Sequence, residues 1–240
     1  MSTQPEKMEW TSERVARFWD YESTRPEFYF TNRYGAEITD ALKRLTDKKD
    51  ILDYGCGAGH LIPHLVKAGF QVTGGDFSPE SIKQVNSTYK SLNGFSGAHH
   101  VAELIEGNQH FDTIVSVEVI EHLEDDILAS TLDAYKKLLR KGGTLIVTTP
   151  NNENMDVSTV LCPCCNHTFH RWQHVRSWNA ESLGQYFENA GFKAQRVFST
   201  NLSVPHWRKI VMPIKNLSRK LRGKPPKQSQ NLIGVFTYND

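Results

Sequence analysis

Residues 115–126, VSVEVIEHLEDD, place three groups capable of chemistry directly after an apolar run. Glu118, Glu121 and His122 follow β-branched residues typical of a buried strand, so they lie where that strand would end. The E-x-x-E-H spacing at the start of a helical turn lets two carboxylates and an imidazole converge on one cation. Oxygen ligands with an imidazole suit Mg²⁺, Mn²⁺ or Zn²⁺. In the alternative interpretation, Glu118 and His122 act as acid and base without a metal.

A second motif, DYGCGAG at residues 53–59, joins an apolar run to a helix-like stretch. Its glycines match neither the G-x-G-x-x-G spacing of dinucleotide-binding turns nor a phosphate-binding loop that ends in Gly-Lys-Ser/Thr. Glycines at alternate positions let the backbone pass close to a ligand, and Asp53 can meet an ammonium group. Asp76 ends the next strand-like run, where a carboxylate can accept both hydroxyls of a ribose. The motif therefore indicates a nucleotide-type ligand, and the alternative is a turn made only for close helix packing.

The stretch LCPCCNHTFH, residues 161–170, offers a separate metal site. C-x-x-C is half of a zinc knuckle, and histidines would have to complete the ligand set. The predicted zinc ligands are Cys162, Cys165, His167 and His170. The alternative is a reduced, flexible or substrate-covering loop. Three of the four cysteines crowd together, unlike the dispersed cysteines of a secreted disulfide framework, which favours reduced thiols or a metal.

A basic stretch at residues 208–227, RKIVMPIKNLSRKLRGKPPK, holds eight Lys and Arg and no acid. Apolar residues recur in it at helical spacing, at Ile210, Ile214, Leu217 and Leu221. Such a stretch is most often a solvated helix face, yet it also permits docking on an anionic membrane surface or a phosphate-bearing substrate.

Strand-like and helix-like stretches alternate through the middle of the chain and must position these motifs. Strands are predicted at 51–55, 71–76, 111–117, 142–150, 193–199 and 231–238, with helix-like stretches at 60–69, 78–90, 127–143 and 180–192. This alternation predicts an α/β fold with a doubly wound, mainly parallel sheet. Ligands of such sheets bind beyond the carboxyl ends of the strands, where the first two motifs lie.

The remaining chain divides into segments around this core. A Rossmann-like core is predicted at 49–200 and 229–240, with an N-terminal helical cap at 1–48, a Cys/His-rich insert at 151–178 and the basic amphipathic segment at 205–228. The cap is expected to hold helices at about 11–20 and 36–46 that lie over the mouth of the sheet.

Composition excludes several classes of protein. The chain of 240 residues is 38% hydrophobic and 23% charged, as in globular proteins, and no apolar run approaches the roughly 18 residues of a membrane span. Its net charge of +1 argues against a globally basic nucleic-acid binder. The N-terminal residues MSTQPEKMEW show no secretory h-region, so a cytoplasmic location is the expectation.

The ordered motifs ILDYGCGAG, VTGGDFSPESI, FDTIVSVEVIEHL and GGTLIVTTPN resemble those of class I S-adenosylmethionine-dependent methyltransferases over residues 35–200. The resemblance implies that Asp53, Gly55 and Gly57 face the methionine end of the cofactor. It places Asp76 and Phe77 at the ribose. The full predicted cofactor-binding set is Asp53, Gly55, Cys56, Gly57, Asp76, Phe77, Ala102, Glu103 and Val117, with Ala102 and Glu103 at the adenine edge.

The E-x-x-E-H motif at this strand end is similar to that of ubiquinone-pathway O-methyltransferases and small-RNA terminal 2′-O-methyltransferases. The resemblance implies a divalent metal that binds substrate oxygens, with a further histidine downstream that His174 in FHRWQHVRSW matches. The predicted metal ligands are therefore Glu118, Glu121, His122 and His174, and the predicted catalytic residues are Glu118, His122 and His174.

We therefore expect a metal-assisted O-methyltransferase that acts on a diol-type hydroxyl of a catechol, sugar or ribose, because two adjacent hydroxyls would chelate the metal best. The alternatives are a metal-independent methyltransferase of small metabolites and a non-catalytic module that binds the cofactor. The expected partner is a small-molecule or glycan acceptor. RNA is less favoured, and residues 208–227 allow peripheral contact with a membrane or a phosphate-bearing substrate.

Overall fold

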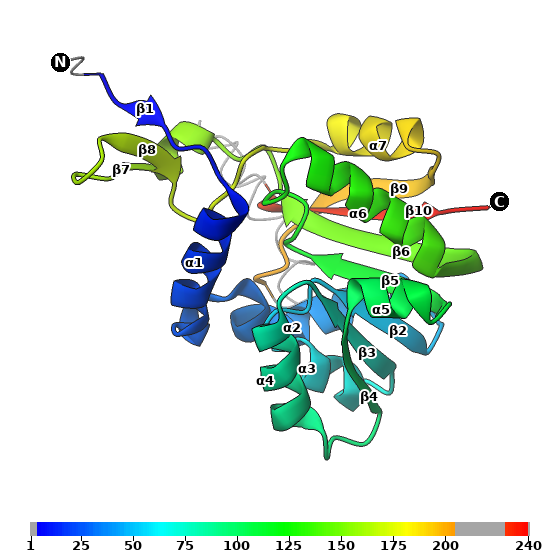
Figure 1. Cartoon of the computed structure of the whole chain (residues 1–240). Coiled ribbons are helices and arrows are strands. Elements are labelled where there is room, and N and C mark those ends of the chain that lie inside the picture. Colours follow the sequence, from blue (N-terminus) through cyan, green and yellow to red (C-terminus); the bar gives the residue numbers. More distant parts are fainter. Residues whose placement is uncertain (1–3, 205–228, 240) are drawn as a thin grey trace.

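A computed structural model describes residues 4–204 and 229–239, so the basic stretch 208–227 lies outside the described residues. The described chain is an α/β protein with a seven-stranded sheet in the order β4-β3-β2-β5-β6-β10-β9 (Figure 1). This confirms the predicted fold class. The strands of the sheet are β2 (Asp50–Tyr54), β3 (Gln71–Asp76), β4 (Phe95–His100), β5 (Phe111–Val117), β6 (Leu139–Pro150), β9 (Lys193–Thr200) and β10 (Asn231–Thr237).

The first five strands of this order are parallel to their neighbours, whereas β10 runs antiparallel to both β6 and β9. Parallel strands finish at the same edge of a sheet, so the residues that follow β2, β3, β5 and β6 come together. In Figure 1 the arrowheads of β5 and β6 point toward α1 (Ser12–Ser23) and the hairpin of β7 (Thr159–Leu161) and β8 (His167–His170). The carboxyl edge of the sheet therefore faces the N-terminal cap and the insert.

Alternating side chains build a core on each face of the sheet. Ile114 of β5 points into one hydrophobic cluster, and the next residue, Val115, points into the other. The first cluster is completed by α5 (Val101–Glu106), α6 (Asp125–Leu138) and α7 (Ala180–Asn189). The second is completed by α2 (Phe30–Leu42), α3 (Ile62–Lys67) and α4 (Pro79–Tyr89). Both faces are thus covered, as a doubly wound sheet requires.

Helix starts follow capping residues that the sequence already carries. The Ser78 side chain accepts the backbone N–H of Ser81 at 3.2 Å, and Pro79 occupies the first position of α4. Thr11 caps α1 in the same way. The second N-terminal helix differs from the prediction of 36–46, because α2 already begins at Phe30 and ends at Leu42. A short 3-10 turn, η1 (Pro26–Phe28), brings the chain around to this earlier start.

Four strands and a helix of the described structure were not predicted. The edge strand β4 has the sequence FSGAHH, which lacks apolar alternation because it is only half-buried, and α5 has only six residues. In the insert, β7 pairs with β8, and β8 pairs with the two-residue strand β1 (Glu6–Lys7). The insert also contains a 3-10 turn, η2 (Met155–Ser158). The N-terminus and the insert are therefore joined by a small three-stranded sheet.

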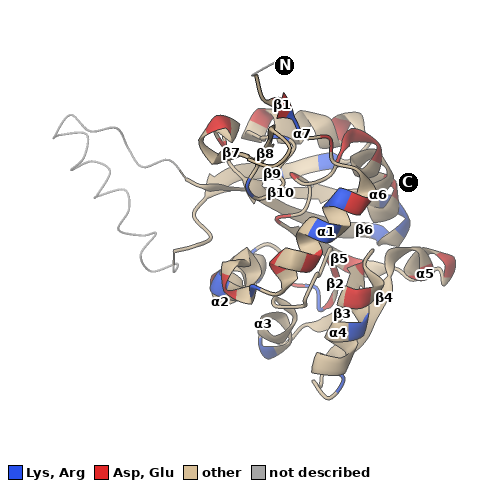
Figure 2. Cartoon of the chain, turned by 60° about the vertical axis from the view of Figure 1, so that its left-hand side comes forward, with Lys and Arg blue, Asp and Glu red and all other residues tan. Residues whose placement is uncertain are grey.

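Charge is spread over the described surface, with basic and acidic residues interspersed on the helices (Figure 2). Within the described ranges, no helix has both the length and the apolar character needed to cross a bilayer.

Substitution of Phe187 tests the packing on the α7 side of the sheet. Phe187 is fully buried and stacks on Phe236 with ring centroids 4.4 Å apart. Phe187→Ala should lower the free energy of unfolding by about 3–5 kcal/mol, because it removes apolar contacts and leaves a cavity. Val157→Ala, at a position 80% exposed, should change it by less than about 0.5 kcal/mol. Denaturant titration followed by circular dichroism measures both, and equal losses would contradict this assignment of the core.

Candidate active site

The glycine turn after β2 is held against the end of β3. The backbone N–H of Gly55 donates to the Gly75 carbonyl at 2.7 Å, and the N–H of Gly57 donates to Asp76 Oδ2 at 2.8 Å. Gly55 and Gly57 have φ of 74° and 50°, a region that favours glycine. A Cβ on Gly55 would lie 2.7 Å from Val119, whereas a Cβ on Gly57 would meet no atom within 4 Å. The turn therefore packs on one side and is open on the other, where a ligand can approach.

Asp53 lies beneath this turn with a carboxylate oxygen that needs a partner. The residue is 3% exposed, and its Oδ2 has no hydrogen-bond partner among the described residues. Burial, assisted by the charge of Asp76, raises the pKa of Asp53 to about 7. An ammonium group placed here would hydrogen-bond the free oxygen and favour the ionised form. The chemistry of the turn thus fits the methionine end of S-adenosylmethionine.

The predicted ribose carboxylate is fixed in place by the backbone. Asp76 Oδ1 accepts the N–H of Ser78 at 2.9 Å, in addition to the bond from Gly57. Burial raises the pKa of Asp76, and these backbone hydrogen bonds oppose the shift. Phe77 is 50% exposed and stands edge-on to Tyr54, so a broad apolar surface adjoins the carboxylate.

The other predicted cofactor residues follow the neighbouring strands. Val117 is the buried last residue of β5, and the half-buried Cys56 lies inside the glycine turn. Ala102 and Glu103 are exposed in the first turn of α5. The Glu103 carboxylate accepts the backbone N–H of His100 at 3.4 Å in a capping box. Glu103 therefore has a structural contact beside its predicted place at the adenine edge.

Tyr29 of the N-terminal cap reaches the same region and was not among the predicted residues. Burial, followed by the charges of Glu22 and Asp76, raises the pKa of Tyr29 to about 12. Its ring lies edge-on to His60 in the glycine-rich segment, with centroids 5.4 Å apart. The cap thus covers the cofactor side of the site. A lone aromatic residue between two helices carries no sequence signal for this contact.

Glu118 lies close enough to Glu121 that its charge helps to raise the pKa of Glu121, but it is outside the ligand group that the structure assembles. It follows β5 with φ of 54°, and its backbone N–H donates to the Thr148 carbonyl at 3.1 Å. The Thr148 hydroxyl donates to Glu118 Oε1 at 2.8 Å, and the Asn231 side chain donates to the same carboxylate. Burial raises the pKa of Glu118 to about 7. Because these contacts orient its carboxylate toward β6 and β10, Glu118 is not part of the ligand group that the structure assembles.

Glu121, His122 and His174 form that group, since one ligand atom of each lies within 4.8 Å of the others. His122 Nε2 is 4.0 Å from Glu121 Oε1. Glu121 is 1% exposed, and neither of its oxygens receives a hydrogen bond of normal geometry, although Thr149 lies close. Burial raises the pKa of Glu121, while burial and the neighbouring His174 lower the pKa of His122 to about 3. Three of the four predicted ligands are therefore together.

A second group, which the sequence did not reveal, shares His174. Glu153, His170 and His174 also have ligand atoms within 4.8 Å of one another. Glu153 Oε2 is 2.5 Å from His174 Nδ1, and Glu153 Oε1 is 3.3 Å from His170 Nε2. Burial would raise the pKa of Glu153, but the two imidazoles outweigh it and hold that pKa at about 2. Glu153 lies two residues after the T-P-N motif, which is the one feature of the sequence that could have indicated it.

The separate zinc set is not assembled in the described residues. Cys162 and Cys165 lie at the tip of the β7–β8 hairpin, where the Cys162 N–H donates to the His167 carbonyl at 2.8 Å. His170 lies at the far end of β8 and is buried against Glu153 instead. The hairpin separates the residues because β8 is extended between His167 and His170. Of the two possible ligand groups among the described residues, neither contains a cysteine.

Gln173 connects the cap to the segments that carry His122 and His174. It is fully buried with φ of 60°, and its side-chain N–H donates to the His122 carbonyl at 3.0 Å. The Trp19 indole N–H of α1 donates to Gln173 Oε1 at 3.0 Å, and the Trp19 ring stands edge-on to His122. The site is thus enclosed by the cap and the insert together.

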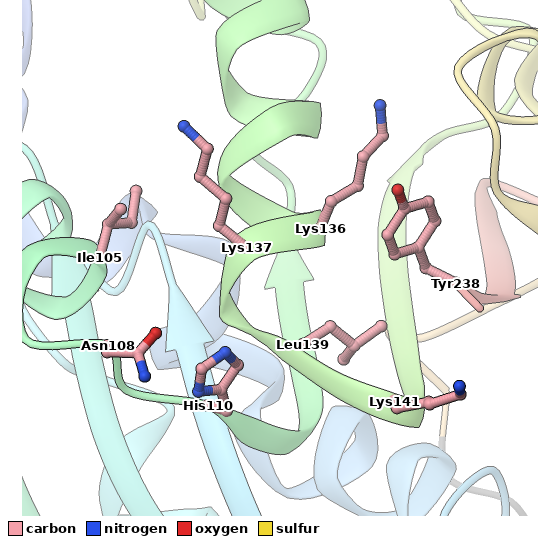
Figure 3. Close-up of a pocket in the computed structure, with 8 residues that line it drawn as sticks. All are labelled: Ile105, Asn108, His110, Lys136, Lys137, Leu139, Lys141 and Tyr238. Carbon is pink, nitrogen blue, oxygen red and sulfur yellow. The ribbon is translucent and has the colours of Figure 1, made fainter. Parts of the chain in front are cut away.

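A surface hollow of about 480 Å³ lies at the opposite edge of the sheet (Figure 3). His110, which precedes β5, lines it together with Lys136 and Lys141. Because β5 has seven residues, this hollow is about 20 Å from Glu118 and takes no part in the site. The chemistry resides at the carboxyl edge instead.

The sheet order, the glycine turn and the strand-end Asp76 define a Rossmann-like methyltransferase fold of the S-adenosylmethionine-dependent class. Residues 21–197 match the family described as "Methyltransferase domain", and the chain belongs to that family.

Similar proteins agree with this class. The chain is similar to a probable S-adenosylmethionine-dependent methyltransferase of Mycolicibacterium smegmatis, with 30% identity over 61% of this chain and 53% of the relative. It is also similar to a ubiquinone biosynthesis O-methyltransferase of Aromatoleum aromaticum, with 30% identity over 63% of this chain and 64% of the relative. The chain thus spans between half and two thirds of these curated relatives.

Among solved structures, a glycopeptide N-methyltransferase, MtfA, complexed with S-adenosyl-L-methionine shares the fold. The TM-score is 0.61 at 11% sequence identity, and the match covers 87% of this chain and 96% of that chain.

Asp53 leads to a prediction about cofactor affinity and pH. An ammonium beside Asp53 prefers the ionised carboxylate, so affinity should be highest above pH 7 and fall by up to tenfold per unit below it. Titration calorimetry with S-adenosylhomocysteine between about pH 5.5 and 7.5 measures this. Asp53→Asn should bind more weakly and lose this dependence.

A matched ligand isolates the contribution of Asp53. 5′-Methylthioadenosine lacks the amino-acid group, so its affinity should not change with pH through the ionisation of Asp53. Any effect of Asp76 on the ribose should be the same for both ligands. The same pH profile for the two ligands would contradict an ammonium contact at Asp53.

Proposed function

We propose that this chain is an O-methyltransferase that uses S-adenosylmethionine and a divalent metal to methylate one hydroxyl of a diol-type acceptor. The ligands would be Glu121, His122 and His174, with substrate oxygens in the open positions. The observation that carries the proposal is the Glu121 carboxylate, which is 1% exposed yet receives no hydrogen bond of normal geometry. A buried carboxylate without a partner costs free energy that a cation offsets.

The spacing of the three side chains supports a shared ion. Ligand atoms about 2.0–2.2 Å from one metal lie about 3–4.2 Å apart, depending on the angle between them. The 4.0 Å between His122 Nε2 and Glu121 Oε1 falls at the upper end of this range, and the group as a whole, within 4.8 Å, would close by a few tenths of an ångström around an ion. Two imidazoles with one carboxylate suit Zn²⁺ or Mn²⁺ better than Mg²⁺, which prefers oxygen ligands.

The remaining groups have separate roles in this proposal. A bound metal would lower the pKa of an acceptor hydroxyl and fix its direction. His122 and His174 are then occupied as ligands, which leaves Glu118 as the proton acceptor, oriented by Thr148. The enclosure by Trp19 and Gln173 excludes water from the reacting oxygen. The name O-methyltransferase of the Aromatoleum relative agrees with oxygen as the methylated atom.

Glu121→Gln tests the metal. It keeps the size of the side chain and removes the charge, so Mn²⁺ affinity should fall by more than about 100-fold, since even outer partners of metal ligands contribute 10–100-fold. S-adenosylhomocysteine affinity should stay within about twofold. Glu124→Gln, the same change at an exposed position three residues later, is the matched control. Calorimetry with each ligand measures both affinities.

Activity then separates the candidate functions. A screen of catechols, sugars and ribose-terminated acceptors with labelled cofactor should give a product that chelation abolishes and Mn²⁺, Zn²⁺ or Mg²⁺ restores. Full activity after chelation would favour the metal-independent alternative, with Glu118 and His122 as acid and base. Cofactor binding without any product would favour the non-catalytic module.

A further inference from the structure

We infer that Glu153 is a positioning residue which, held by His170, fixes the tautomer of His174 so that Nε2 is free to bind the metal. This inference rests on the metal site proposed above. Neither Glu153 nor a role of this kind for His170 was predicted from the sequence. The observations that carry it are the contacts of three side chains that meet behind the metal group (Glu153, His170 and His174).

The first step concerns the proton on His174. Its Nδ1 is 2.5 Å from Glu153 Oε2, and the two side chains are 9% and 19% exposed. An ionised carboxylate only accepts hydrogen bonds, so His174 Nδ1 must carry the hydrogen. In a neutral imidazole the other nitrogen, Nε2, then has the lone pair. The carboxylate therefore selects Nε2 as the atom that can bind a cation beside Glu121 and His122.

The second step concerns what holds the carboxylate. His170 Nδ1 accepts the backbone N–H groups of His174 and Trp172 at 3.3 and 3.4 Å. When the His170 ring is neutral, its hydrogen must therefore be on Nε2, which lies 3.3 Å from Glu153 Oε1, at ion-pair distance but without the geometry of a hydrogen bond. Each oxygen of Glu153 thus faces an N–H of a different ring. The His170 and His174 rings stack with centroids 4.4 Å apart and 17° between their planes, which fixes the position of one imidazole relative to the other.

The same hydrogen bonds argue against a second metal within the group of Glu153, His170 and His174. A ligating imidazole nitrogen must have a free lone pair. His170 Nε2 carries the hydrogen, because His170 Nδ1 is already an acceptor for the backbone. His174 Nδ1 likewise donates to Glu153. The arrangement is that of a carboxylate behind a metal-binding histidine, in which the outer group orients the inner one.

The tautomers of His174 and His170 can be measured in the metal-free protein. In the metal-free protein at about pH 8.5, well above the ordinary imidazole pKa, long-range ¹H–¹⁵N spectra should show a protonated Nδ1 for His174 and a protonated Nε2 for His170. Glu153→Ala should move His174 toward the Nε2–H form that free imidazole side chains prefer. Glu153→Gln retains an oxygen that can accept the Nδ1–H, so it should preserve the wild-type tautomer better than Glu153→Ala.

Metal affinity gives the second measurement. Glu153→Ala should weaken Co²⁺ or Mn²⁺ binding by about 10–100-fold, Glu153→Gln should weaken it less, and both should leave S-adenosylhomocysteine affinity unchanged. Asp156→Asn, an exposed acid three residues later, is the matched control and should change none of these values. If Glu153→Ala does not fold, as shown by loss of S-adenosylhomocysteine binding, Glu153→Gln and His170→Gln provide the comparison.

The outcomes separate this inference from the proposed function. A wild-type protein that binds no Co²⁺ or Mn²⁺ overturns the metal proposal, and the positioning role in metal binding with it, whatever the tautomer. A wild-type protein that binds metal while His174 carries its hydrogen on Nε2 overturns the inference alone. So does unchanged metal affinity in folded Glu153→Ala. The expected pattern is a loss of metal affinity together with a change of tautomer, confined to variants of Glu153 and His170.

Discussion

Buried carboxylates at the carboxyl ends of the parallel strands are the constraint on which the rest of this structure depends. Asp53 lies near the end of β2, Glu118 and Glu121 follow β5, and burial raises the pKa of all three. Taking an ionised carboxylate out of water costs several kcal/mol unless a cation or hydrogen bonds offset it. The hydrogen bonds of the protein satisfy Glu118 but leave oxygens of Asp53 and Glu121 without partners. The protein therefore has two anionic positions that suit cationic ligands.

The segments that carry Asp53 and Glu121 are in direct contact with each other. The turn that carries Gly55 packs directly on Val119, which lies between Glu118 and Glu121. At Gly55 any side chain would collide with Val119, so the glycine allows the cofactor turn and the E-x-x-E-H loop to touch. Methyl transfer needs the sulfonium methyl and the acceptor oxygen in line at close range. Contact between the two loops fixes the separation of the glycine turn from Glu118 and Glu121.

The sequence predicted the central strands and the cofactor turn because their signals are local. Apolar runs that end at Asp53 or Asp76 are visible within a few residues. The edge strand β4 was missed because a half-buried edge strand has no need of apolar alternation. His174 was identified only through a resemblance, Glu153 was missed, and His170 was assigned to the separate zinc set instead of the group with Glu153 and His174. Their meeting depends on the turn of the β7–β8 hairpin, which no local pattern records.

The insert and the N-terminal cap therefore form part of the candidate site. A core alone would present Glu121 and His122 at an open sheet edge, where water would solvate them. The structure closes that edge with Gln173, which bonds both the His122 carbonyl and the indole of Trp19. Gln173 is fully buried with a positive φ, a conformation that costs free energy for a residue other than glycine. Its backbone conformation and its two bonds place the following residue, His174, against the sheet. The specificity of the enzyme should then reside in the cap and the insert, whereas the chemistry common to the class resides in the strands.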